Sequence, residues 1–363
     1  MSRICHQQIR FIHLIHDLLR RLSHSKNLFS FFASGLNKIE KQALNIWITK
    51  FNTERVNWFP GTVQIEPSSM CNLRCKSCSY SLETTNKFNL TAEQVEQLLK
   101  RLSFPIKSII LSGIGEPLIN PDLFAIIDQL AARKIKCTIY TNGTLLTPQK
   151  ADMILSRNNI ISLAISCDSS IKNIFEELRT GADFEEWEYN VRSFMTKSKN
   201  MQSNHIKITM FTVISEYNVK EADQILRYAA SLGFRNINYF DPVPIPNNNN
   251  FGGYFSAISS GFDKDHILQL GKELGIKVIL SFRRNMIPPK AKIRCYQPWE
   301  YIMIKTNGDV YPCRALFKTD ESRVIGNIYH EDFSDIWHGE KVQLFRKTSA
   351  NGTNEYCRIC PYY

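Results

Sequence analysis

The stretch TVQIEPSSMCNLRCKSC, residues 62–78, decides the fold because a strand pattern leads directly into a group of thiols. Residues 62–66 are rich in β-branched side chains, which is typical of a strand. The loop that follows carries Cys71, Cys75 and Cys78. Soft thiolates at this density favour zinc or an iron–sulfur cluster, and three ligands leave one metal position open. The sequence therefore predicts a metal site at the end of the first strand.

The strand pattern recurs downstream. Short β-branched runs alternate with helical stretches as far as residue 240, as in the βαβ units of a parallel sheet. The further candidate strands span residues 108–112, 136–140, 160–166, 206–213 and 236–240. Residues 91–102 and 121–133 predict two of the intervening helices, and Thr91 with Gln94 can form a capping box in the first. We therefore expect an α/β fold built as a partial (β/α)6 TIM-type barrel.

Glycine, hydroxyl and carboxylate residues follow three of the predicted strands. The sequences SGIGEP (112–117), TNG (141–143) and SCDS (166–169) close the second, third and fourth strands. Because the carboxyl ends of parallel strands meet at one edge of a sheet, we expect these residues beside the three thiols. Glycines at such an edge let the backbone approach a ligand closely, and hydroxyl and carboxylate groups can hydrogen-bond a ribose.

The CxxxCxxC spacing of Cys71, Cys75 and Cys78 resembles that of the radical S-adenosylmethionine superfamily. The resemblance implies that these cysteines hold a catalytic 4Fe-4S cluster whose open iron chelates the amino and carboxylate groups of S-adenosylmethionine. It also implies a 5'-deoxyadenosyl radical that abstracts hydrogen from a substrate, with a reduced flavodoxin or ferredoxin-type protein as electron donor. From the residues alone, the alternative is a structural zinc site that lacks its fourth ligand.

Further features resemble the same superfamily in the same order along the chain. The resemblance assigns S-adenosylmethionine contacts to Gly113, Gly115, Glu116, Thr141, Asn142, Ser166, Asp168 and Arg179. Glu116 is expected to accept a hydrogen bond from the methionine amino group, and Arg179 to face the methionine carboxylate. A surface salt bridge is the alternative for Arg179.

One position departs from the superfamily pattern. Many members place an aromatic residue, in contact with adenine, just before the third cysteine, and this chain has Ser77 there. Tyr80, two residues beyond Cys78, is the candidate replacement. The alternative for Tyr80 is an exposed loop tyrosine without a ligand.

A second set of cysteines lies near the C-terminus and comprises Cys295, Cys313, Cys357 and Cys360. Asn307-Gly308 is a strong hairpin signal, and the hairpin would bring Cys295 and Cys313 together. The segment resembles the SPASM auxiliary-cluster domain, and more closely its shortened twitch form, which implies a second 4Fe-4S cluster on these four cysteines. Four thiolates leave no open iron, so we expect this cluster to carry electrons; structural zinc is the alternative.

Composition and charge describe an ordinary globular chain with a basic end. The 363 residues are 43% hydrophobic and 22% charged, with a formal net charge of +11. Residues 1–60 carry nine Lys or Arg against three Asp or Glu, which indicates a local attachment surface and argues against nucleic acid as the main partner. Residues 5–24 predict an amphipathic helix that packs on the main domain, with contact to a membrane surface or a protein as the alternative.

The sequence also bears on the compartment. Seven of the ten cysteines fall at metal-ligand spacing, which favours a reducing environment, and Cys5, Cys137 and Cys167 are left as expected buried free thiols. We find neither a signal-peptide pattern nor an apolar run of about 18 residues. These features predict a cytoplasmic protein, with peripheral membrane attachment as the alternative.

The expected organisation has four parts. They are a basic, mainly helical extension (1–60), a radical S-adenosylmethionine barrel (61–245), a bridging region (246–290) and a small α+β twitch/SPASM-like iron–sulfur domain (291–363). The leading hypothesis for function is oxidation of a small polar metabolite, with the second cluster as electron acceptor. Alternatives are maturation of a ribosomal precursor peptide and, without enzymatic activity, a zinc-binding adaptor for nucleic acid or membrane. The sequence identifies neither the substrate nor the general base.

Overall fold

The fold is that of a computed structural model, which describes residues 54–56, 58–78, 87–201, 205–242, 261–282, 295, 297–314, 323–354 and 357. The described strands form one sheet in the order β10-β9-β8-β1-β2-β3-β4-β5-β6-β7. The predicted helix over residues 5–24, Cys5, Tyr80 and Cys360 lie outside the described residues. Within the described ranges, no helix is long and apolar enough to cross a membrane.

The strands and helices have the following bounds. The strands are β1 (Thr62–Ile65), β2 (Ser108–Leu111), β3 (Lys136–Thr141), β4 (Ile160–Ser166), β5 (Lys207–Val213), β6 (Asn236–Phe240), β7 (Lys277–Ser281), β8 (Tyr301–Ile304), β9 (Asp309–Tyr311) and β10 (Gly326–Asn327). The α-helices are α4 (Ala92–Arg101), α5 (Leu123–Ala132), α6 (Pro148–Leu155), α7 (Lys172–Leu178), α8 (Phe184–Asn200), α9 (Ala222–Ser231), α10 (Lys264–Glu273), α11 (Gln297–Glu300), α12 (Phe333–His338) and α13 (Glu340–Ala350). Two 3₁₀ turns, η2 (Pro117–Ile119) and η3 (Val219–Glu221), precede α5 and α9.

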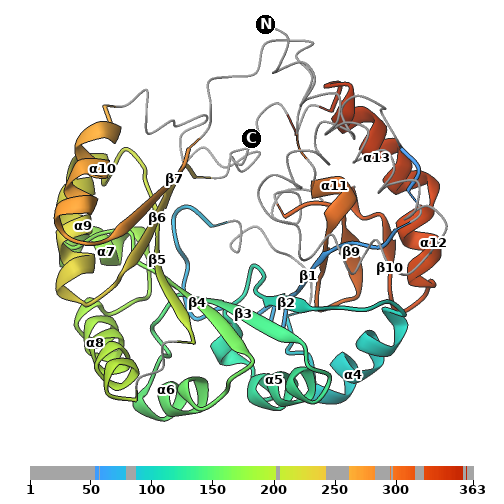
Figure 1. The fold of residues 1–363 in the computed structure, drawn as a ribbon, viewed down its shortest axis with the longest axis horizontal. Coiled ribbons are helices and arrows are strands. Elements are labelled where there is room, and N and C mark those ends of the chain that lie inside the picture. The colour runs from blue at the N-terminus through green and yellow to red at the C-terminus, as the bar shows by residue number, and fades with distance from the viewer. Residues whose placement is uncertain are drawn as a thin grey trace, which may run out of the picture.

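Strands β1 to β7 are parallel neighbours in chain order, and a helix follows each strand from β1 to β6. Figure 1 shows the strands curving into an open barrel with α4 to α10 along its outer rim. The prediction of an α/β partial (β/α)6 barrel is confirmed. The sixth helix, α10, and an additional strand, β7, lie within residues 246–290, which were expected from the sequence to form a bridging region.

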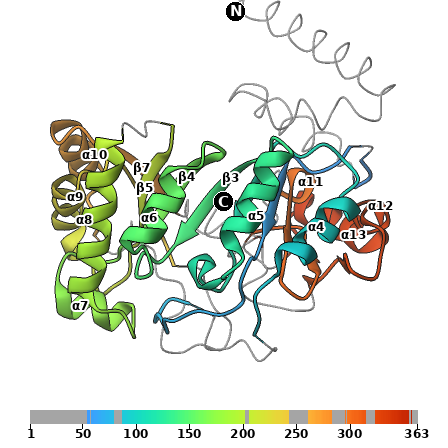
Figure 2. The ribbon, with the colours of Figure 1, turned by 90° about the horizontal axis from the view of Figure 1, so that it is seen from below.

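The outer face of the sheet is apolar because alternate strand residues point toward the helices. These residues include Val63, Ile65, Ile109, Leu111, Ile139, Leu163, Ile165, Met210 and Ile237, all buried in one core. Figure 2 shows α4, α5, α6 and α8 side by side over that face. The predicted capping box is present in α4, where Thr91 Oγ1 accepts from Gln94 N at 3.1 Å and Gln94 Oε1 accepts from Thr91 N at 2.9 Å.

The C-terminal part continues the barrel sheet. Strand β8 pairs in parallel with β1, and β9 pairs antiparallel with β8. The hairpin predicted from Asn307-Gly308 is confirmed, and Gly308 has φ +87°, a conformation that favours glycine. The indole nitrogen of Trp337 on α12 donates to Trp58 O at 2.6 Å, and that of Trp58 donates to Trp299 O at 3.1 Å. The C-terminal domain is therefore joined to the barrel by strand pairing and by buried side chains.

Candidate active site

The loop after β1 rests against the loop after β2. Gly115 allows this approach, because a Cβ at this position would lie 2.2 Å from Ser68 O and 2.6 Å from Met70 O. The next residue fixes the contact, since Glu116 N donates to Met70 O at 2.7 Å. Gly115, which was expected to make room for a ligand, therefore also makes room for the backbone that leads into Cys71.

The other side of the cysteine loop is held by the end of α7 and the segment after it. Arg74 N donates to Thr180 O at 2.8 Å, and Lys76 N donates to Leu178 O at 2.9 Å. A salt bridge between Lys76 and Glu177 lies beside these bonds. The loop is therefore clamped between two segments at the carboxyl edge of the sheet, the edge that the sequence predicts for ligand binding.

The three thiols of this loop are half-buried and electrostatically coupled. Burial is the main cause that raises the pKa of Cys71 to about 11 and that of Cys75 to about 12, and the neighbouring thiols of the set contribute to both values. Among the described residues, no group of three His, Cys, Asp or Glu side chains is already in metal-binding geometry. Binding of a metal group would require these thiols to lose their protons.

Glu116 joins the loop after β2 to the end of β3. Its carboxylate is 2% exposed and accepts three hydrogen bonds, from Thr141 Oγ1 at 2.7 Å, Leu118 N at 3.0 Å and Asn142 N at 2.7 Å. Burial raises the pKa of Glu116, and these donors oppose that rise. Glu116 and Thr141 are therefore engaged with one another, and their expected contacts to S-adenosylmethionine stay predictions.

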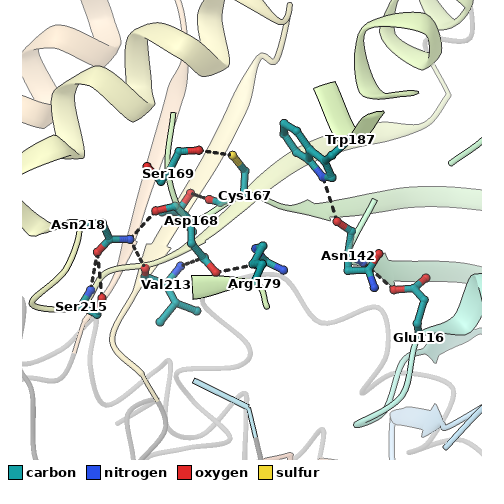
Figure 3. A network of polar contacts seen from close by, with 11 residues as sticks. Glu116, Asn142, Cys167, Asp168, Ser169, Arg179, Trp187, Val213, Ser215 and Asn218 are labelled. Atoms are coloured by element: carbon teal, nitrogen blue, oxygen red, sulfur yellow. Dashed lines mark hydrogen bonds and ion pairs between the residues drawn. The ribbon is translucent and has the colours of Figure 1, made fainter. Parts of the chain in front are cut away.

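Asn142 connects β3 to the cysteine loop. Its Nδ2 donates to Asn72 Oδ1 at 3.0 Å and lies 4.0 Å from Cys71 Sγ. Its carbonyl accepts a bond of 3.0 Å from the indole nitrogen of Trp187 on α8 (Figure 3). The next residue must be glycine, because Gly143 has φ +84° and a Cβ there would lie 2.6 Å from the Trp187 indole nitrogen.

Asp168 and Arg179 form a buried ion pair of 2.8 Å, with side chains 4% and 8% exposed. Asp168 Oδ1 also accepts from Val213 N at 2.8 Å (Figure 3). The Arg179 guanidinium lowers the pKa of Cys75, which partly offsets the effect of burial. Its Nε is buried and has no hydrogen-bond partner among the described residues. The salt bridge considered for Arg179 is present, but its expected surface location is wrong, because the pair is buried beside the cysteine loop.

The remaining predicted contacts lie at the same edge. Gly113 follows β2, and Ser166 is the last residue of β4, partly exposed and opposite Phe211 of β5. Whether these residues bind a ligand stays a prediction.

Sequence reasoning missed Asn218, which lies in the loop after β5 and is fully buried. Its Nδ2 donates to Asp168 O at 2.5 Å and to Val213 O at 2.8 Å, and its Oδ1 accepts from Ser215 N at 2.7 Å (Figure 3). Asn218 thus ties the loop after β4 to the loop after β5. A signal was available, since polar residues follow this strand as they follow the previous three.

The second set of cysteines lies around the C-terminal hairpin. Cys313 follows β9, and its neighbour Arg314 donates from Nε to Gln297 Oε1 at 3.2 Å, two residues from Cys295. Cys357 Sγ lies 3.4 Å from Ser349 Oγ, and burial raises its pKa to about 12 with a further contribution from Cys313. Three of the four predicted ligands can therefore be placed, whereas Cys360 lies outside the described residues.

Described cysteines of both sets pack against the same small apolar cluster. This inner cluster comprises Ile114, Tyr301, Met303, Tyr311 and Phe345. Cys71 and Cys78 pack against it from the barrel, and Cys313 packs against it from the C-terminal hairpin. Cys137 and Cys167 are buried elsewhere as free thiols, as predicted.

Family models match both halves of this arrangement. Residues 65–229 match the radical SAM superfamily, and residues 295–361 match the SPASM iron–sulfur cluster-binding domain. The chain belongs to the radical SAM superfamily. This radical SAM enzyme has a C-terminal SPASM domain, and its cofactors are 4Fe-4S clusters and S-adenosylmethionine.

Curated relatives of this radical SAM enzyme are distant and act on unlike substrates. It is 23% identical over 331 residues to an AdoMet-dependent heme synthase of Methanosarcina barkeri, covering 84% of this chain and 89% of the relative. It is 24% identical over 325 residues to the subtilosin biosynthesis protein AlbA of Bacillus subtilis, covering 85% and 67%. It is 22% identical over 312 residues to the S-adenosyl-L-methionine-dependent 2-deoxy-scyllo-inosamine dehydrogenase of Niallia circulans, covering 82% and 91%.

Solved structures confirm the fold. Streptococcus suis SuiB bound to its precursor peptide SuiA superposes with a TM-score of 0.65 at 17% sequence identity, covering 88% of this chain and 74% of SuiB. The likeness extends over the barrel and the C-terminal domain together, since it covers most of both chains.

Proposed function

We propose that this radical SAM enzyme abstracts hydrogen from a small polar metabolite and oxidises it, with the auxiliary cluster as electron acceptor. The observation that carries the proposal is the clamped cysteine loop. Its backbone is fixed by Glu116 on one side and by Leu178 and Thr180 on the other. Three half-buried thiols are thereby presented at the carboxyl edge of the barrel beside a buried cation, Arg179.

The residues at this edge fit a 4Fe-4S cluster and S-adenosylmethionine. Cys71, Cys75 and Cys78 supply three soft ligands and leave one iron open. The buried Arg179 Nε has a hydrogen-bonding capacity that no described protein group meets, which suits an anionic ligand. When bound, the two groups supply a carbon-centred radical at the mouth of the barrel.

The chain's own residues hold and orient that chemistry. Arg179 would face the methionine carboxylate, while Asp168 fixes the orientation of the guanidinium. Gly113 and Gly115 let the adjoining loop pack closely against Glu66 and against the backbone that leads into Cys71.

The other polar residues at the edge take the remaining roles. The Glu116 carboxylate already accepts three protein hydrogen bonds and would accept a further one from the methionine amino group. Asn142 holds the cysteine loop through its hydrogen bond to Asn72. Thr141, Ser166 and Asp168 are the proposed ribose contacts. Each of these groups is already placed by protein hydrogen bonds or by its strand, so little reorganisation is needed on binding.

In the proposed oxidation the auxiliary cluster accepts an electron. Its ligands would be Cys295, Cys313, Cys357 and Cys360. The substrate would lose one hydrogen atom, then a proton to a base or water, and one electron to this cluster. Support comes from the inner cluster, against which Cys313 packs as well as Cys71 and Cys78. The inosamine dehydrogenase relative, of which this chain covers 91%, is consistent with such an oxidation.

Two partners complete the proposal. A reduced flavodoxin or ferredoxin-type protein would supply the electron that starts each turnover. Residues 1–60, most of which lie outside the described residues, would provide an attachment surface because they are basic.

Peptide modification is the second candidate, and a specific observation favours it. The match to the subtilosin biosynthesis protein is as long and as strong as the match to the dehydrogenase. The zinc-binding adaptor is no longer a competing hypothesis, because both domains match iron–sulfur families.

The deciding experiment uses anaerobically reconstituted, reduced protein and a Cys71→Ala, Cys75→Ala, Cys78→Ala variant. Iron content and the electron paramagnetic resonance spectrum report the clusters, and release of 5'-deoxyadenosine reports radical initiation. The variant should keep the auxiliary cluster, lose about half of the iron and release no 5'-deoxyadenosine. Wild-type protein that holds both clusters and S-adenosylmethionine yet releases none would contradict the proposal. Deuterium transfer into 5'-deoxyadenosine from labelled polyols or from labelled peptides then separates the two candidate substrates.

A further inference from the structure

Two buried polar residues lie at the carboxyl end of β1, Gln64 within the strand and Glu66 directly after it, and they are 7% and 0% exposed. Each side chain is bonded on the side of β2 and on the side of β8, to the strand itself or to the loop that follows it. Gln64 Nε2 donates to Ser112 O at 2.9 Å on the β2 side, and the Tyr301 hydroxyl donates to Gln64 Oε1 on the β8 side. Strand β1 is therefore bonded by its side chains, as well as by its backbone, to the barrel and to the C-terminal domain.

Glu66 makes the same double connection with a carboxylate. Its Oε1 accepts from Ile114 N at 2.7 Å, in the loop that bears Gly113, Gly115 and Glu116. Its Oε2 lies 3.3 Å from Thr306 N and 3.4 Å from Thr306 Oγ1, at the turn between β8 and β9. A fully buried carboxylate thus collects donors from two loops, and hydrogen bonds to a charged acceptor are stronger than neutral ones.

Gly113 leaves the space that the Glu66 side chain occupies. A Cβ on Gly113 would lie 2.2 Å from both Cγ and Oε1 of Glu66, closer than real contacts allow. The absence of a side chain at Gly113 therefore serves the connection to Glu66, whatever it does for a ligand.

Beyond Glu66 the connection continues through packed side chains. Ile114, whose amide binds Glu66, belongs to the inner cluster together with Tyr301 of β8. Cys71, Cys78 and Cys313 pack on that cluster. One loop bonded to Glu66 therefore contributes Ile114 to the cluster on which cysteines of both sets pack, and the other joins the strands that contribute Met303 and Tyr311.

We propose that Glu66 is a positioning residue that couples the β8–β9 turn of the auxiliary domain to the loop of residues 113–116, so that disturbing the turn weakens S-adenosylmethionine binding. This inference rests on the proposed function for the identity of the ligand, S-adenosylmethionine. The hydrogen bonds that join the turn to the loop do not depend on that identity. Coupling between two sites is reciprocal, so S-adenosylmethionine binding also orders the auxiliary turn.

The test compares holoenzyme variants by amide hydrogen exchange and by the dissociation constant of S-adenosylmethionine. Glu66→Gln keeps the shape of the side chain but replaces one acceptor oxygen with a donor that faces a backbone N–H. Exchange should rise by about tenfold or more both in residues 113–116 and in the β8–β9 turn, which corresponds to the loss of one charged hydrogen bond. The dissociation constant should rise by a similar factor.

A second variant acts from the auxiliary side alone. Thr306→Val removes the hydroxyl that lies 3.4 Å from Glu66, and Tyr329→Phe is the matched control because the Tyr329 hydroxyl lies 3.5 Å from Thr306 O without contacting Glu66. Thr306→Val should raise exchange in residues 113–116 and weaken S-adenosylmethionine binding about threefold. Tyr329→Phe should change exchange at the turn only.

Two outcomes would overturn the inference. One is a Glu66→Gln variant in which exchange rises on one side alone, and the other is a Thr306→Val variant whose affinity for S-adenosylmethionine equals that of the wild type. A residue that only stabilises the fold would lower the melting temperature and leave that affinity unchanged. Failure of the proposed function looks different, because coupled exchange and binding would then persist in a protein that releases no 5'-deoxyadenosine.

Discussion

The two faces of the parallel sheet carry different chemistry. The face toward the helices presents residues such as Ile139 and Leu163, which are fully buried and apolar. The face toward the barrel interior presents Glu66, Asn142 and Asp168, which are buried but bonded to neighbouring loops. The outer face therefore contributes most of the folding free energy through apolar burial. The inner face lowers stability because it buries polar groups, whose orientation serves ligand binding.

The largest expected effect is on the inner face, at the Asp168–Arg179 pair. Arg179→Met should lower the free energy of unfolding by about 3–5 kcal/mol, because it leaves a buried carboxylate without its partner. Chemical denaturation measures this loss, and binding of S-adenosylmethionine should be lost as well.

The double variant Asp168→Asn, Arg179→Met separates the two consequences. It should recover part of the stability, since no buried charge remains, but it should recover no affinity for S-adenosylmethionine. Affinity that returns together with stability would show that Arg179 acts only as a structural partner.

On the outer face, Leu163→Ala should lower the free energy of unfolding by about 2–5 kcal/mol, since it opens a cavity in the core between the sheet and its helices. The iron content and the affinity for S-adenosylmethionine of the folded fraction should equal those of the wild type. Altered affinity in folded protein would break the division between the two faces.

A smaller effect is expected at Glu116. Glu116→Gln keeps the volume but places a donor against the Thr141 hydroxyl or the Asn142 amide, so it should cost about 1–3 kcal/mol of stability. The affinity for S-adenosylmethionine should fall in isothermal titration, whereas the iron content stays that of the wild type. Iron loss equal to that of a cysteine variant would place Glu116 among the groups needed for cluster assembly.

The smallest effect at neutral pH is expected at Cys137, on the outer face. Burial raises the pKa of Cys137 from 9.0 to about 12. Because the unfolded thiol ionises first, its contribution to stability is complete below pH 9 and is lost as the pH rises toward 12, by about 1.4 kcal/mol per pH unit. Cys137→Val should flatten the fall in melting temperature between pH 9 and pH 10.5. If the melting temperature of the variant falls with pH as steeply as that of the wild type, groups other than Cys137 cause the fall.

Much of the fold could be predicted because local pattern and tertiary structure agree. The runs at residues 160–166 and 236–240 form strands with those bounds, and the Thr91 capping box begins α4 as expected. The pairing of β8 with β1 could not be predicted, because strands about 240 residues apart leave no local signal.

The candidate site divides in the same way. Cysteine spacing and the polar residues after each strand indicated where the site lies. The hydrogen bonds of Glu116, the burial of Arg179 and the role of Asn218 depend on which loops meet, and a single sequence does not carry that information.

The pairing of β1 with β8 also sets an order for biosynthesis. Strands β1 to β7 can assemble as the chain leaves the ribosome, but one edge of β1 stays open until residues 301–304 have been made. Until then Gln64 lacks Tyr301 and Glu66 lacks Thr306, so the nascent barrel exposes an unpaired strand edge next to its cysteines. Insertion of the catalytic cluster is thus expected to be productive only after residues 301–304 have been made and β8 has paired with β1.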